Sequence, residues 1–139
     1  MKSLNIPVEE FTTPDPITAV EATPLTELIA LMKDHGVRHL PILRNEKVVG
    51  IISDRDVHLA SGLTSREKIQ IQASDLMVLN PITVSSQESL EAVAFEMSQK
   101  KIGSVIVNDE NDKLLGIFTV TDALNALIEI ARSKKTISL

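Results

Sequence analysis

The chain has 139 residues, 43% of them hydrophobic, a formal net charge of −5 and no Cys, Trp or Tyr. This length fits one compact domain or two interlocked half-domains, and the apolar fraction excludes a disordered chain. The absence of cysteine excludes disulfides and cysteine metal sites, and the acidic balance argues against nucleic-acid binding. No apolar run reaches the length of a membrane span and the start has no signal-peptide core, so we expect a cytoplasmic protein without membrane association.

The first half begins with residues 1–15, which lack a clear periodicity, and then predicts a helix. Thr23 and Pro24 are typical of a helix start, because Thr is a good N-cap and Pro is favoured at the first helical position. Gly36 predicts the end of the helix. The apolar positions of this helix recur at i, i+3, i+4 and i+7, and they are Leu25, Leu28, Ile29 and Met32.

A β-hairpin is predicted after this helix. Residues 37–43 and 47–52 are apolar and rich in β-formers, and the polar residues 44–46 lie between them. A short helix is expected to follow Asp54.

The second half repeats the pattern. Strands are predicted over residues 102–107 and 113–118, joined by the polar residues 109–112. The helix that precedes these strands has its apolar positions at Leu90, Val93, Ala94 and Met97. A final helix carries one apolar face, made of Leu124, Leu127, Ile128 and Ala131.

The order of these elements reflects an internal repeat. Pro16-Ile17-Thr18 returns as Pro81-Ile82-Thr83, and the segment 50–56, which runs from Gly to Asp, returns as 116–122. Each copy is therefore predicted as a β-α-β-β-α unit, too small to be stable without burying a face against the other. We expect residues 1–61 to form the first repeat with its lead-in, 62–74 a polar and partly helical linker, 75–132 the second repeat, and 133–139 a frayed tail.

Each copy contains a Ser or Thr followed three residues later by Asp, where a strand gives way to a helix. The pairs are Ser53 with Asp56 and Thr119 with Asp122. One interpretation is a capping box, in which the two side chains satisfy backbone N–H groups at the start of the helix.

The doubled motifs resemble the cystathionine-β-synthase (CBS) domain family in its tandem form, the Bateman module, here as a stand-alone pair. The resemblance covers residues 11–132 and depends on three features that occur twice in order: the Pro-Ile-Thr strand, the strand at 37–41 or 102–106, and the Gly-apolar-apolar-Ser/Thr-x-x-Asp segment. It implies an α+β fold in which two β-α-β-β-α repeats pack sheet to sheet as a pseudo-symmetric pair.

The resemblance also implies a function. CBS pairs sense adenosine-containing ligands such as AMP, ADP, ATP, NAD or S-adenosylmethionine, regulate something else, and have no chemistry of their own, so we expect no catalytic cofactor. The two Asp carboxylates would each accept two hydrogen bonds from a ribose diol, a role compatible with capping. The expected partners are the adenosine ligand, a second copy in a homodimer, and a regulated protein that the sequence does not identify.

In this family the Asp of one copy meets the strands of the other, which defines two predicted sites. The first site would comprise Thr12, Ile17, Val37, Arg38, His39, Pro41, Thr119, Thr121 and Asp122. The second would comprise Asn80, Ile82, Ile102, Gly103, Ser104, Ser53, Arg55 and Asp56. Arg38 is the expected phosphate partner in the first site and Arg55 in the second, so the two sites are not equivalent.

Alternatives to this hypothesis remain. One is a structural dimerisation module whose clefts are empty and whose Asp residues only cap helices. For the adjacent residues Arg38 and His39, the alternation of side chains along a strand already places one of the two in solvent. The presence of that one polar residue on the strand therefore needs no ligand to explain it. A zinc site is not expected, because His35 and His39 are separated by a helix break, and no motif for an activated nucleophile is present.

Overall fold

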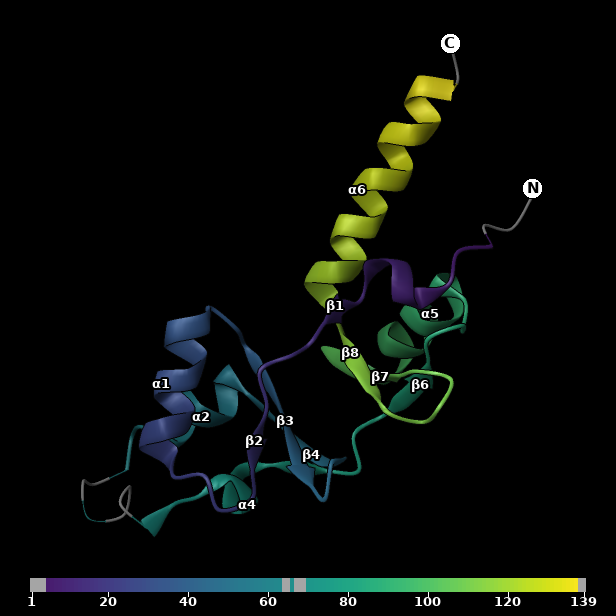
Figure 1. Ribbon diagram of the computed structural model, residues 1–139. Helices are drawn as coiled ribbons and strands as arrows, with labels where there is room; N and C mark the ends of the chain where they lie inside the picture. Colours follow the sequence, from purple (N-terminus) through teal and green to yellow (C-terminus); the bar gives the residue numbers. More distant parts are fainter. Residues whose placement is uncertain (1–4, 64–65, 67–69, 138–139) are drawn as a thin grey trace. The chain divides into compact units, whose positions relative to one another are not determined.

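The computed structural model describes residues 5–63, 66 and 70–137 and divides into two compact units (Figure 1). One unit consists of Pro16–Pro81. The other joins the chain up to Asp15 to the residues from Ile82 onward. The fold is mixed α+β, as predicted, with one four-stranded sheet in each unit.

The Pro16–Pro81 unit contains the first repeat. Its sheet has the strand order β2-β3-β4-β5; β2 runs parallel to β3, and the other pairs are antiparallel. Its elements in chain order are β2 (Ala19–Val20), α1 (Leu25–His35), β3 (His39–Arg44), β4 (Lys47–Ser53), α2 (Asp54–Ala60), α4 (Ala73–Leu76) and β5 (Val78–Leu79).

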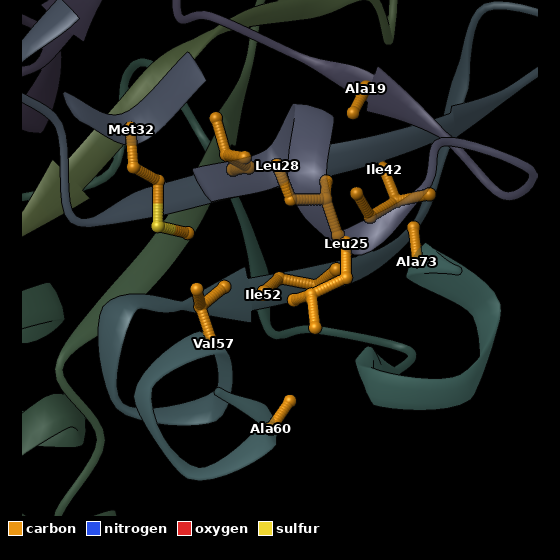
Figure 2. Close-up of a cluster of buried hydrophobic side chains, with 10 residues drawn as sticks. Ala19, Leu25, Leu28, Met32, Ile42, Ile52, Val57, Ala60 and Ala73 are labelled. Atoms are coloured by element: carbon orange, nitrogen blue, oxygen red, sulfur yellow. The ribbon is translucent and has the colours of Figure 1, made fainter. Parts of the chain in front are cut away.

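The core of this unit lies where α1 and α2 meet the sheet (Figure 2). Leu25 and Leu28 of α1 are fully buried, as the helical spacing predicted, and Ile42 and Ile52 of the hairpin are fully buried with them. The remaining buried members of this core are Ala19, Met32, Leu40, Val57, Ala60 and Ala73.

The ends of α1 confirm one expectation and correct another. Gly36 ends the helix in the left-handed conformation, with φ of 62°. The residue at the N-cap position is Pro24, which has no side chain for capping; Thr23 is not the cap. The hydroxyl of Thr23 instead accepts a 3.0 Å hydrogen bond from the backbone N–H of Val20, so it closes the turn that precedes the helix.

The second unit contains the second repeat and has the same topology. Its sheet has the strand order β1-β8-β7-β6; β6 is parallel to β7, and the other pairs are antiparallel. Its elements are η1 (Val8–Phe11), β1 (Thr13–Pro14), β6 (Thr83–Ser85), α5 (Leu90–Lys100), β7 (Ser104–Asn108), β8 (Leu114–Thr119) and α6 (Val120–Ile137). Its buried core consists of Val8, Val84, Leu90, Val93, Met97, Val105, Val107, Phe118 and Ala126.

The lead-in segments are exchanged between the repeats, which differs from the boundaries expected from the sequence. The segment before the first repeat pairs through β1 with β8 of the second repeat, and its Val8 is fully buried in that repeat's core. In the same way, β5 precedes the second repeat but pairs with β4 of the first. Each sheet therefore receives its fourth strand from the lead-in of the other repeat.

This exchange explains the glycine that begins each repeated motif. A Cβ at Gly116 would collide with the backbone oxygen of Thr13, and a Cβ at Gly50 would lie 2.6 Å from the sulfur of Met77. Both collisions are with the exchanged lead-in, so the motif glycines leave room for it to approach the sheet.

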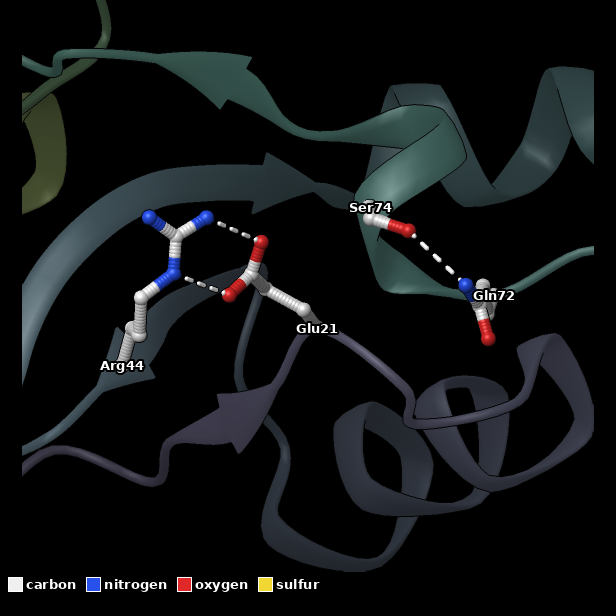
Figure 3. A network of polar contacts seen from close by, with 4 residues as sticks. All are labelled: Glu21, Arg44, Gln72 and Ser74. Atoms are coloured by element: carbon white, nitrogen blue, oxygen red, sulfur yellow. Dashed lines mark hydrogen bonds and ion pairs between the residues drawn. The ribbon is translucent and has the colours of Figure 1, made fainter.

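Two polar contacts in the first-repeat unit lie near the ends of its strands and at the start of α4 (Figure 3). Arg44, at the end of β3, donates hydrogen bonds of 2.6 and 2.7 Å to the two carboxylate oxygens of Glu21, just after β2. This bond lowers the pKa of Glu21 and raises that of Arg44. Before α4, the side-chain amide of Gln72 donates a 3.1 Å hydrogen bond to the hydroxyl of Ser74.

The end of the last helix differs from the sequence-based expectation, and parts of the expected linker and tail lie outside the described residues. Helix α6 continues to Ile137, past the expected tail start at Ser133, because neither Gly nor Pro interrupts it. The expected linker includes residues 64–65 and 67–69, and the expected tail includes 138–139, which lie outside the described residues.

Candidate functional site

The two Ser/Thr-x-x-Asp motifs form the same hydrogen-bonded box in the two units. In the first repeat, the backbone N–H and the hydroxyl of Ser53 donate hydrogen bonds of 2.9 and 3.0 Å to Oδ2 of Asp56. The N–H of Asp56 donates back to the Ser53 hydroxyl at 3.3 Å. This arrangement is the capping box that the sequence predicted at the start of α2.

The second repeat has the corresponding box at the start of α6. Thr119 donates from its N–H and its hydroxyl to Oδ2 of Asp122, at 2.9 and 3.0 Å, and the N–H of Asp122 donates back at 3.2 Å. Asp122 is buried and Asp56 only half-buried. In each box the bonds leave Oδ1, the other carboxylate oxygen, outside the capping arrangement.

The boxes differ in what reaches Oδ1. The hydroxyl of Thr13 in β1 donates a 3.1 Å hydrogen bond to Oδ1 of Asp122. The matching position in the other unit is Val78, since Thr13 pairs with Ile117 and Val78 with Ile51. Valine has no hydroxyl to donate, and among the described residues of this unit no side chain or backbone group donates a hydrogen bond to Oδ1 of Asp56.

Arg38 and His39 lie beside the first-repeat box. His39 pairs with Ser53 across the β3–β4 ladder, and the carbonyl of Arg38 accepts a 2.8 Å hydrogen bond from the N–H of Asp54. The Arg38 side chain is exposed and that of His39 is half-buried. Burial lowers the pKa of His39, and the carboxylates of Asp54 and Asp56 oppose this shift.

Gly103 and Ser104 occupy the corresponding place in the second repeat. The carbonyl of Gly103 accepts a 3.1 Å hydrogen bond from the N–H of Val120, just as that of Arg38 does from Asp54. Next to Gly103 is a hollow of about 450 Å³, and it is lined by Ala94, Met97, Ser98, Lys101, Ile102, Gly103, Val120 and Ala123. Where the first repeat offers a guanidinium and an imidazole, the second offers open, mostly apolar space.

Other predicted site residues are engaged in structural contacts. Thr12 is buried and its hydroxyl donates to the carbonyl of Val8 at 2.8 Å, so it is the neighbouring Thr13 that meets the carboxylate. Pro41 is fully buried. Ile17 packs against the first-repeat core, and Ile82 packs against the second.

The remaining predicted residues lie near the boxes by position. Arg55 and Thr121 are exposed in the first turns of α2 and α6, and Val37 is half-buried just before β3. Asn80 has a positive φ of 52°, and its N–H donates to the carbonyl of Val49. Within one unit the structure thus brings Ser53, Arg55 and Asp56 near Arg38. In the other unit it brings Thr119, Thr121 and Asp122 near Gly103, whereas Thr12 lies against Val8 and Gly116. The crossed combination of strands and carboxylates stays a prediction.

Thr13 is the site residue that sequence reasoning missed. Its signal was weak, because Thr12 and Thr13 are adjacent and identical, and only the register of β1 against β8 decides which hydroxyl faces Asp122.

Two further features, a metal site and a membrane span, are absent from the described part of the chain. No three metal-ligating side chains among these residues come together. No helix within the described ranges combines the length and apolar character needed to cross a bilayer.

The model of the CBS domain family matches the sequence twice, over residues 8–61 and 73–129. The chain therefore belongs to the CBS domain family and carries a tandem pair of these domains. Its two sheets also agree with solved CBS-pair structures. A putative acetoin utilization protein (AcuB) from Vibrio cholerae is 30% identical, with a TM-score of 0.82 over 96% of this chain and 98% of that one.

Two other relatives bear on what such a pair does. The CBS-pair protein CBSX2, solved in complex with AMP, is 25% identical with a TM-score of 0.77, over 90% of this chain and 98% of that one. An inosine-5′-monophosphate dehydrogenase from Korarchaeum cryptofilum is 32% identical over 114 residues, which are 82% of this chain but 23% of that enzyme. The chain thus spans about a quarter of the length of this curated relative.

Proposed function

We propose that this chain is a regulatory module that binds an adenine nucleotide (AMP, ADP or ATP) through the Asp56 and Asp122 carboxylates. The observation that carries the proposal is the pair of Ser/Thr–Asp boxes, each of which directs one carboxylate oxygen away from the capping bonds. A carboxylate is a strong acceptor for ribose hydroxyls. The AMP complex of CBSX2, and the complex of the MJ0100 CBS pair with 5′-methylthioadenosine and S-adenosyl-L-methionine (29% identical, TM-score 0.78, 89% of this chain and 97% of that one), support this ligand class.

The remaining roles follow from charge. The exposed guanidinium groups of Arg38 and Arg55 are the proposed phosphate partners, since arginine stays charged and presents several donors at once. The apolar residues of the two predicted sites would hold the adenine. The proposal assigns binding to this module and no bond-making step.

The output would be a change in population between two states of the module. A ligand shifts such an equilibrium only by its differential affinity for the two states. We propose that the change is transmitted through a homodimer face on α6. Its exposed apolar side chains follow one helical stripe, and they are Val120, Leu124, Leu127 and Ile128.

A second candidate function has support of its own. Both carboxylates cap helices in the described structure, so their presence is explained without any ligand. In that case the chain is a structural dimerisation module.

Thermal unfolding with and without ligand separates the two candidates. AMP, ADP, ATP, NAD and S-adenosylmethionine are tested on the wild type and on Asp122→Asn and Asp56→Asn, which retain an oxygen for capping. A ligand at 100 times its dissociation constant stabilises a protein by about 2.7 kcal/mol, which raises the melting temperature by several degrees. We expect a rise with at least one adenine nucleotide and a loss of more than tenfold in affinity in one variant. No rise with any ligand would contradict the proposal and favour the structural module.

A further inference from the structure

We propose that Thr13 is a specificity-determining residue, because it limits Asp122 to one ribose hydroxyl while Asp56 accepts two. The two repeats would then respond differently to nucleotides that lack the 2′- or 3′-hydroxyl. This inference rests on the proposed function, and it concerns how each carboxylate reads the sugar.

The argument starts from the acceptor capacity of Asp122. A carboxylate offers about four lone-pair positions, two on each oxygen. Oδ2 of Asp122 uses both of its positions for the N–H and the hydroxyl of Thr119. Oδ1 uses one position for the hydroxyl of Thr13. One position is therefore left for a ligand.

Asp56 has a larger remaining capacity. Its Oδ2 is occupied in the same way by the N–H and the hydroxyl of Ser53. Within its own unit, its Oδ1 receives no hydrogen bond from a described residue, and Val78 stands where the other unit has Thr13. Two positions on this oxygen are left for a ligand.

A ribose diol detects this difference because it donates two hydrogen bonds. At Asp56 both hydroxyls can donate to the carboxylate. At Asp122 only one can, and the other meets at best the neutral oxygen of Thr13, a weaker acceptor than an ionised one. A hydrogen bond to a charged group contributes enough that its loss weakens binding about tenfold.

The test compares AMP, 2′-deoxy-AMP and 3′-deoxy-AMP by isothermal titration calorimetry in variants that keep one carboxylate. With Asp122→Asn, where Asp56 remains, we expect each deoxy analogue to bind about tenfold more weakly than AMP. With Asp56→Asn, where Asp122 remains, we expect only one analogue to lose about tenfold, and the other to stay within about twofold of AMP. Thermal unfolding of each variant verifies that it is folded.

Reciprocal substitutions at the two β-strand positions supply the matched controls. Thr13→Val added to Asp56→Asn should make binding sensitive to both hydroxyls, whereas Thr13→Ser, which keeps the donor, should not. Val78→Thr added to Asp122→Asn should make binding sensitive to one hydroxyl only. If the deoxy analogues lose the same affinity relative to AMP at both carboxylates, and the substitutions at residues 13 and 78 do not change this, the inference is overturned and the proposed function stays intact. If the wild type binds ADP or ATP in place of AMP, the deoxy analogues of that nucleotide are used in the same comparison. A wild type that binds none of the three nucleotides would overturn both the inference and the proposed function, and the two failures are thereby distinguished.

Discussion

Gly50 and Gly116 hold equal places in the two repeats, but an added methyl group would meet different neighbours. At Gly116 it would meet the backbone oxygen of Thr13, which moves only if β1 moves. At Gly50 it would meet the side chain of Met77, whose flexible thioether can rotate away. The same substitution therefore tests whether backbone or side chain limits the approach of the exchanged strand.

We expect Gly116→Ala to lower the free energy of unfolding by about 2–3 kcal/mol, in the range of overpacking, and Gly50→Ala by about 1 kcal/mol or less. The difference arises because alanine also restricts the unfolded chain, which offsets a mild clash but not a severe one. Urea unfolding measures both values. Gly62→Ala is the control, since a Cβ there comes no closer than 3.4 Å to the carbonyl oxygen of Leu59. A loss at Gly50 equal to that at Gly116 would contradict this account.

Among the elements, those with a clear hydrophobic period were predictable and the short exchanged segments were not. The stripe through Leu25 and Leu28 located α1, and the Ser53 motif predicted its capping box, because both signals lie within a few residues. By contrast, β1 has two residues, Thr13 and Pro14, too few to show any alternation. Its pairing with β8 depends on contacts more than a hundred residues away along the chain.

The candidate site was predictable to the same degree. The sequence identified Asp56 and Asp122 because each repeats with its hydroxyl partner. It did not identify Thr13, because this residue matters only through the register that sets its hydroxyl against Asp122. A repeat in sequence thus reveals the motifs that the two copies share, and the structure is needed to match positions outside those motifs, such as Thr13 and Val78.

The exchanged lead-in should stabilise the second repeat rather than the first. Val8 is fully buried in the second-repeat core, so Val8→Ala removes two methyl groups and leaves a cavity there, at a cost of about 2 kcal/mol. We expect hydrogen exchange to speed up in α5, β7 and β8 while β3 and β4 keep their protection, since units of this kind open separately.

The mirror variant for this prediction is Leu28→Ala, in the first-repeat core. It should speed exchange in β3 and β4 and spare β7 and β8. If either variant speeds hydrogen exchange equally in both sheets, the two units unfold as one. That result would contradict the prediction that the lead-in stabilises the second repeat and not the first.

At the scale of the whole molecule, two sides of α6 have separate roles: one side packs against its own unit and the other side is exposed and apolar. Its first turn holds Asp122 in the capping box, and Ala126 packs into the second-repeat core. The proposed dimer face follows a different side of the same helix, where Leu124 is 53% exposed and Leu127 is 62% exposed. One helix would therefore connect the carboxylate that meets the ligand with the surface that meets a second copy.

This connection predicts that a charge on the apolar stripe breaks the dimer without unfolding the chain. Leu124→Lys places an ammonium where two copies would bury leucine, and an unpaired charge in an interface costs several kcal/mol. Light scattering after size exclusion should then give a dimer mass for the wild type and a monomer mass for the variant at the same concentration. Asn125→Lys adds the same charge one residue further along, off the stripe, and should remain dimeric. A wild type that is monomeric at high concentration would remove α6 as the output surface, and the ligand signal would then have to leave the module by another face.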